Sequence, residues 1–134
     1  MLYAWDILVT ANTLESAPKE QLLKITSGVI VLVTVSYRAG CQGWVRVRIL
    51  HEESVLVPLN KDTWLTGDDE TVPAPMWFKI SATGNILKFR AHSAGTTYPH
   101  TITVRVSILP PEVALILEAL GWIKGIAQRM GLIA

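Results

Sequence analysis

The chain has 134 residues, of which 17% are charged and 50% are apolar, and its formal net charge is +1. This length suits a single domain with one hydrophobic core, and the apolar content excludes an intrinsically disordered chain. The near-zero net charge gives no global field for nucleic acid or for an anionic membrane, so we expect no nucleic-acid partner.

Cysteine usage and the N-terminus narrow the class further. Cys41 is the only cysteine, which excludes an internal disulfide and a cysteine-based zinc site. Residues Met1 to Asp6 show no secretory-signal pattern, so we expect synthesis inside a cell. The wholly apolar run from Val29 to Val33 is far shorter than the roughly 20 residues that cross a bilayer, and no membrane span is predicted.

Residues 1–109 alternate between apolar and polar side chains with a period of two, as half-buried β-strands do. No helical pattern separates these segments, which predicts antiparallel pairing in two packed sheets. We therefore predict a mainly β protein, an antiparallel β-sandwich or jelly roll of about eight strands. The strand segments begin near Tyr3, Leu23, Val29, Val45, Val55, Trp77, Leu87 and Thr101.

Two turns organise the middle of this region. Thr26 to Gly28 predicts a turn between two neighbouring strands, and Arg38 to Gly43 predicts a hairpin loop. The strand before this loop should carry one apolar face, and the strand after it should point its valines and Ile49 inward and its arginines outward. The residues concerned are Val29, Val31, Val33, Val35 and Tyr37 before the loop, and Val45, Arg46, Val47, Arg48 and Ile49 after it.

The segment from Asn60 to Pro75 is predicted to be a long irregular loop. Its acidic run, Asp68, Asp69 and Glu70, supplies carboxylate oxygens of the kind that calcium binds. The spacing fits no EF-hand loop, however, so a solvated acidic turn is favoured and no metal site is predicted.

Three aromatic residues in or beside loops suggest an alternative function. Trp64, Trp77 and Tyr98 would form a ligand rim for sugar rings if they were exposed together at one end of the sandwich. Alternatively, they cap the hydrophobic core, as most tryptophans do. The sequence thus leaves a glycan-binding β-sandwich module open as the second interpretation.

Signatures of other chemistry are missing from the sequence. There is no G-x-S-x-G motif, no phosphate-binding glycine loop, and no histidine close to Cys41 in sequence. The three histidines lack metal-ligand spacing, so we expect neither an enzyme nor a cofactor. Five outward-facing basic residues indicate the solvated face of a sheet more than a nucleic-acid surface: Arg46, Arg48, Lys88, Arg90 and Arg105.

The period changes at Pro110-Pro111, which divides the chain into a β-sandwich domain, residues 1–109, and a C-terminal amphipathic helix, residues 110–134. We predict that the helix runs from about Pro111 to Leu132 with one broad apolar face. This face is predicted to serve docking or oligomerisation through Leu115, Ile116, Leu120, Trp122, Ile123, Ile126 and Met130.

Three destinations are open for the apolar face of the helix. It packs on its own sandwich, on a sister chain, or on a membrane surface or separate partner protein. A sister chain is favoured because the β region already holds enough alternating residues for its own core. Only Lys124 and Arg129 are basic, fewer than a membrane-surface helix carries.

The strand pattern from Trp5 to Leu109, together with the apolar arm from Pro111 to Ala134, resembles viral structural proteins, especially the small head-decoration and minor capsid proteins of tailed phages. The resemblance implies a homo-oligomer, most simply a trimer, that binds a capsid or another repetitive protein lattice, resides in the virion and performs no chemistry. The sequence therefore predicts a non-enzymatic structural and assembly protein.

Overall fold

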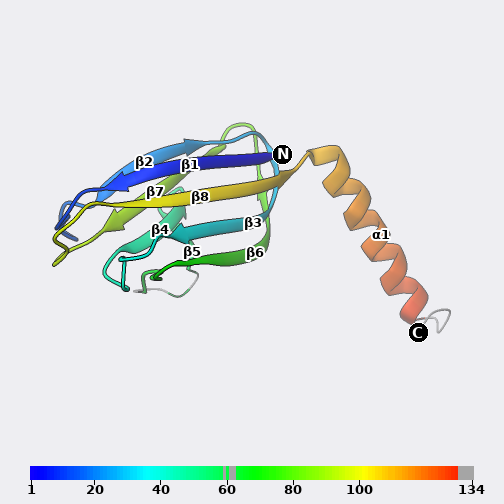
Figure 1. The fold of residues 1–134 in the computed structure, drawn as a ribbon. Helices are drawn as coiled ribbons and strands as arrows, with labels where there is room; N and C mark the ends of the chain where they lie inside the picture. The colour runs from blue at the N-terminus through cyan, green and yellow to red at the C-terminus, as the bar shows by residue number, and fades with distance from the viewer. Residues whose placement is uncertain (59, 61–62, 130–134) are drawn as a thin grey trace.

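The computed structural model describes residues 1–58, 60 and 63–129, and for residues 122–129 it describes the backbone alone. Within that part of the chain it contains eight strands and one helix, so the predicted β-sandwich with a C-terminal helix is confirmed (Figure 1). The strands are β1 (Leu2–Val9), β2 (Lys19–Lys24), β3 (Gly28–Tyr37), β4 (Arg46–His51), β5 (Ser54–Val57), β6 (Glu70–Ile80), β7 (Ile86–His92) and β8 (His100–Leu109).

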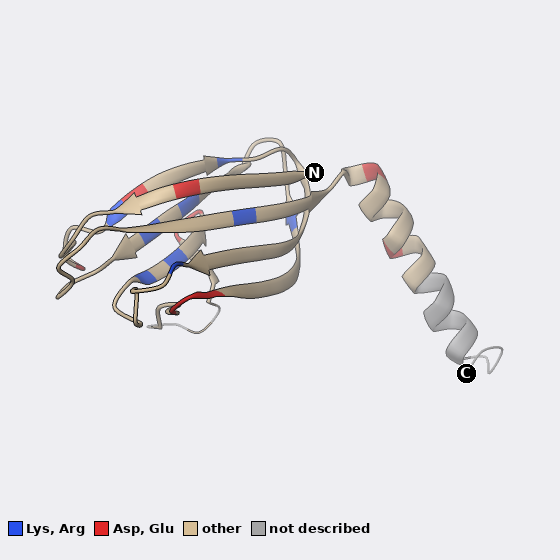
Figure 2. Ribbon diagram, in the orientation of Figure 1, with Lys and Arg blue, Asp and Glu red and all other residues tan. Residues whose placement is uncertain are grey.

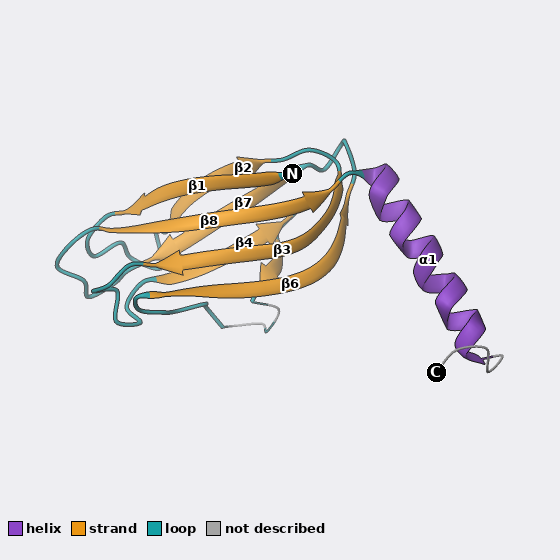
Figure 3. Ribbon diagram, turned by 45° about the vertical axis from the view of Figure 1, so that its right-hand side comes forward, coloured by secondary structure: helices purple, strands orange, loops and turns teal. Residues whose placement is uncertain are grey.

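The strands form two four-stranded sheets that pack face to face (Figure 3). The first sheet has the order β1-β8-β3-β6, and the second has the order β2-β7-β4-β5. Every pair of neighbouring strands is antiparallel. Because the chain changes sheet at each connection except β4 to β5, this is the double-sheet jelly roll that the sequence predicted.

Two of the predicted local connections are wrong. The turn from Thr26 to Gly28 joins β2 to β3, and the loop from Arg38 to Gly43 leads from β3 toward β4, yet each connection links strands in different sheets. Turn residues such as glycine permit a change of direction whether the next strand pairs locally or crosses to the other sheet. The partner of a strand is therefore decided by the rest of the fold.

The hydrophobic core lies between the two sheets. Val45, Val47 and Ile49 are fully buried, as their alternation with Arg46 and Arg48 predicted. In β3 the predicted apolar face is broken, because the register shifts between Ile30 and Leu32. The core is completed from all parts of the sandwich by Ile7, Val9, Leu23, Ile30, Val33, Val35, Leu87, Phe89, Ile102, Val104, Val106 and Ile108.

The predicted irregular loop ends earlier than Pro75, because β6 begins at Glu70. Pro73 and Pro75 lie within this strand, opposite Thr34 and Leu32 of β3. Since β6 pairs only with β3, it is an edge strand, where a residue without a backbone N–H is tolerated. The prolines signalled an edge strand that sequence reasoning assigned to a loop.

Helix α1 (Pro111–Arg129) follows β8 directly and projects away from the end of the sandwich (Figures 1 and 3). Pro111 suits the first turn, since its missing N–H needs no partner there. Within the described residues, no helix combines the length and the apolar character that a bilayer crossing requires. The predicted helix end at Leu132 and the docking residue Met130 lie outside the described residues.

Gly28 permits the close approach of β3 to the end of β8. Its φ is +148°, and a Cβ at this position would lie 2.2 Å from the carbonyl oxygen of Leu109. No side chain fits at that distance without a shift of backbone. Leu109, the last residue of β8 before the helix, therefore packs directly against Gly28.

We expect Gly28→Ala to lower the free energy of unfolding by about 1–3 kcal/mol, because the methyl group meets backbone and the φ is unfavourable. Urea unfolding followed by far-UV circular dichroism measures this loss. The control is Gly121→Ala, since a Cβ at Gly121 meets nothing within 4 Å. Equal unfolding midpoints for Gly28→Ala and the wild type would contradict the close approach.

Candidate functional site

The root of α1 is attached to the sandwich by one buried residue and one carboxylate. Ala114 is 3% exposed and lies with Gly28 and Val29 around a cavity of about 240 Å³. Glu118 accepts a hydrogen bond from Trp77 Nε1 at 3.0 Å and pairs with Lys79 Nζ at 3.0 Å. The contacts come from one side of the helix, so they fix its direction at the first turns.

The carboxylate of Glu118 is held in its charged form by these partners. The hydrogen bond from Lys79, followed by that from Trp77, lowers the pKa of Glu118 below its ordinary value. Trp77 and Lys79 both lie on β6 and are both exposed on the first sheet. The side of the helix that carries Glu118 is thus the side that faces the sandwich.

The apolar side of the helix is left uncovered. Leu115 is 68% exposed, Ile116 is 59% exposed and Leu120 is 56% exposed. Val113 and Leu117 are also exposed, and Glu112 and Glu118 are the charged residues of the described helix side chains (Figure 2). The side chains of the other predicted docking residues are not described: Trp122, Ile123 and Ile126.

A second uncovered apolar region lies where the edge strands β5 and β6 leave the core open. It is a groove of about 500 Å³. Its described lining carries no charge and consists of Leu56, Val57, Pro58, Ala74, Pro75, Met76, Trp77 and Phe78. The exposed helix face and this groove are therefore two apolar surfaces on one chain, and Trp77 both lines the groove and bonds to the root of the helix.

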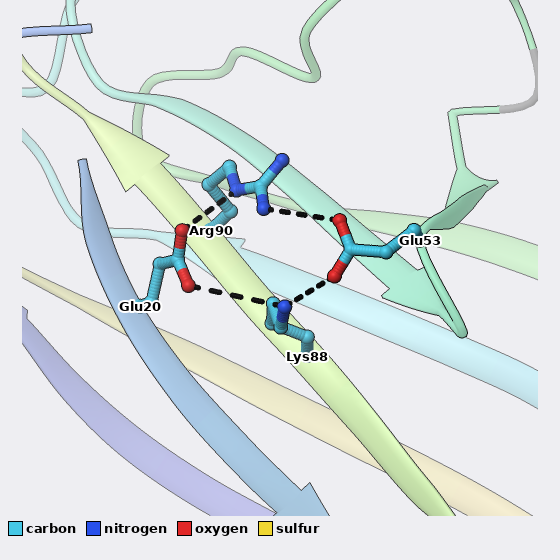
Figure 4. Close-up of polar contacts among 4 residues, drawn as sticks. All are labelled: Glu20, Glu53, Lys88 and Arg90. Carbon is cyan, nitrogen blue, oxygen red and sulfur yellow. Dashed lines mark hydrogen bonds and ion pairs between the residues drawn. The ribbon is translucent and has the colours of Figure 1, made fainter. Parts of the chain in front are cut away.

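Two of the five outward-facing basic residues, Lys88 and Arg90, form ion pairs with carboxylates on the second sheet. Arg90 bonds Glu20 at 3.1 Å and Glu53 at 3.5 Å, and Lys88 pairs with both carboxylates (Figure 4). Lys88, with Arg90 in support, lowers the pKa of Glu53. Arg48 lies over the ring of Trp64, with its guanidinium carbon 4.1 Å from the ring centroid.

The three aromatics of the predicted ligand rim do not meet. Trp64 is half-buried against His92, at a ring distance of 4.5 Å. Trp77 is 46% exposed beside the helix root, whereas Tyr98 is 73% exposed just before the opposite end of β8. The fold places Trp77 and Tyr98 at opposite ends of the sandwich.

Tyr98 instead shares a cleft with Trp44, a residue that sequence reasoning missed. The cleft is about 530 Å³ and lies between the β3–β4 and β7–β8 loops. Trp44 is 53% exposed, and it lies between a glycine-rich turn and the buried Val45. Its position directly before the inward-facing Val45, which continues the outward positions of Arg46 and Arg48, was the available signal.

The acidic run organises this end of the molecule. Asp68 Oδ1 accepts hydrogen bonds from the backbone N–H groups of Gly40 and Gln42, both at 3.0 Å. Glu70 Oε1 accepts one from the N–H of Asp68 at 3.3 Å. The described residues contain no group of three or more acidic, histidine or cysteine side chains placed to hold a metal ion.

Cys41 and His92 are two buried side chains with reactive groups. Burial is the main cause that raises the pKa of the Cys41 thiol, so the nucleophilic thiolate is disfavoured. His92 is 2% exposed, and neither ring nitrogen has a hydrogen-bond partner among the described residues. Burial lowers the pKa of His92, opposed by Glu15 and assisted by Arg46 and Arg48.

Comparisons with known proteins place the fold. No protein-family model and no curated protein matches the sequence. A chain in the solved cyanophage Pam1 capsid asymmetric unit aligns with a TM-score of 0.57 and 11% sequence identity, covering 82% of this chain and 84% of that chain. The predicted resemblance to virion structural proteins is thereby confirmed at the level of architecture.

His92 predicts a loss of stability in mild acid. The unfolded histidine takes up a proton near pH 6.5, whereas the folded one does so at lower pH, so stability is full above about pH 6.5 and falls below it. We expect His92→Phe to flatten this dependence between pH 7.5 and 5.5 in urea unfolding. Parallel slopes for His92→Phe and wild type would refute the assignment.

Proposed function

We propose that this chain is a non-enzymatic structural protein that assembles with copies of itself through α1, as a component of a virion. The observation that carries the proposal is the exposed apolar face formed by Leu115, Ile116 and Leu120 on a helix that leaves its own sandwich. A full burial of each such side chain contributes about 1.5–3 kcal/mol. This free energy favours a partner surface over water.

A sister chain is the partner that the geometry favours. The root contacts of Ala114 and Glu118 direct the side of the helix that carries them to the sandwich and the apolar side away from it. A second copy offers two matching apolar surfaces, the same helix face and the groove beside Met76. Homo-oligomers with closed symmetry are the common outcome when one chain carries complementary patches.

The virion role is supported by architecture. The aligned cyanophage chain belongs to a capsid asymmetric unit, and the alignment spans most of both chains. On this basis we propose further that the chain forms a trimer that attaches to a capsid or another repetitive protein lattice. The burial of Cys41 and the dispersed histidines agree with a protein that performs no chemistry.

The oligomeric state of the full chain tests the proposal. We expect multi-angle light scattering at high micromolar concentration to give a multimer, and Leu115→Glu combined with Leu120→Glu to give a monomer, because two charges then lie on the apolar face. A chain ending at Leu109 keeps all eight strands and is also expected to be monomeric.

The matched control is Gly121→Glu, which adds a charge to the same helix away from Leu115 and Leu120, where a side chain meets nothing within 4 Å. This variant should keep the multimeric mass. A monomeric full chain, or a double variant with the wild-type mass, would overturn the proposal.

A further inference from the structure

The cleft between Trp44 and Tyr98 lies at the end of the sandwich away from the helix. β3 pairs with β8 from Val29↔Leu109 at the helix root to Tyr37↔Ile102 at the far end. The loop that follows β3 carries Trp44, and the loop that precedes β8 carries Tyr98. The cleft is therefore built by two loops that the jelly roll brings together from distant parts of the sequence.

Specific hydrogen bonds hold the first loop in shape. Asp68 Oδ1 accepts hydrogen bonds from the N–H groups of Gly40 and Gln42. The N–H of Trp44 donates to the carbonyl of Cys41 at 2.8 Å. The Cys41 side chain is buried and anchors the loop to the core. The Trp44 ring is thus presented to solvent by a constrained backbone.

The second loop is held by the connection between β1 and β2. Asn12 Oδ1 accepts a hydrogen bond from the N–H of Gly95 at 2.9 Å, and the N–H of Asn12 donates to Thr96 Oγ1 at 2.9 Å. A Cβ at Gly95 would lie 3.6 Å from the Trp44 ring, so this ring lies against the backbone of the opposite loop. The cleft is preorganised, which lowers the entropy cost of ligand binding.

The lining of the cleft defines the chemistry of its ligand. Two exposed aromatic rings stand beside amide, hydroxyl and imidazole groups from Gln42, Thr97 and His100, and the described lining contains no lysine, arginine, aspartate or glutamate. Aromatic faces bind apolar surface, while the polar groups donate and accept hydrogen bonds. Without lysine or arginine in the lining, phosphate and sulfate groups have no cation to bind.

We propose that this cleft binds a neutral saccharide, with the apolar face of a sugar ring on Trp44 or Tyr98 and its hydroxyl groups on Gln42, Thr97 and His100. A neutral oligosaccharide has the apolar ring faces and the uncharged hydroxyls that this lining complements. The volume of about 530 Å³ lies within the usual range of small-molecule sites, about 300–1,000 Å³. The site does not use the helix and stands independently of the assembly proposal.

Fluorine NMR of the full chain labelled with 5-fluorotryptophan tests the site. The five tryptophans give five signals that single Trp→Phe variants assign. Cellotriose, maltotriose and N-acetylated chitotriose are titrated separately. We expect at least one of these sugars to shift the Trp44 signal to saturation while the Trp77 signal stays fixed.

Variants decide where the sugar binds. Trp44→Ala and Tyr98→Ala should each weaken binding at least tenfold, whereas Trp77→Ala, which removes an exposed tryptophan outside the cleft, should leave the affinity unchanged. The remaining tryptophan signals report that each variant is folded. Light scattering of Trp44→Ala and Tyr98→Ala should give the wild-type mass, which separates this test from that of assembly.

Three results would overturn the saccharide site. The first is that none of the three sugars shifts the Trp44 signal. The second is that a sulfated heparin tetrasaccharide binds more tightly than the neutral sugars. The third is that the Trp44 signal changes with protein concentration alone and Trp44→Ala lowers the oligomeric mass, which would assign the cleft to a protein interface.

Discussion

The constraint on which the structure depends is that the two sheets bury each other's inner faces. Strands from both halves of the chain contribute to one core, in which Val33, Ile49, Phe89 and Val104 are fully buried. Once these faces are matched, the sandwich has no inner surface left for a terminal helix. The helix therefore contacts the outer surface of the sandwich, through Ala114 and the hydrogen bonds to Glu118. Its apolar face is left exposed to solvent.

This arrangement gives the molecule two different ends. At one end Gly28 lets the last residue of β8 pack closely, and the helix departs with an uncharged face. At the other end crossing loops form a polar and aromatic cleft around Trp44 and Tyr98. If the helix attaches the protein to a lattice, the cleft faces away from that attachment, so assembly and ligand binding would occupy separate surfaces.

The sequence was most informative where burial follows a simple period. The alternation around Val47 and Ile49 identified both the strand and its inward face, and the prolines at 110 and 111 marked the start of the helix. It was less informative at β6, because Pro73 and Pro75 are acceptable on an edge strand and typical of a loop. The sequence also showed no sign of the register shift in β3, because the run from Val29 to Val33 is apolar at every position and shows no alternation that the shift would interrupt.

By itself, the sequence determined most of the strand segments and the start of the helix, because hydrophobic period is a local property of the chain. Only the tertiary structure decided that Leu115 and Leu120 stay outside the sandwich. It also decided that Tyr98 lines a cleft with Trp44 rather than with Trp64 or Trp77. Those outcomes depend on which strands pair and which connections cross between sheets. Strand pairing is set by contacts between residues far apart in the chain, and a local pattern does not encode them.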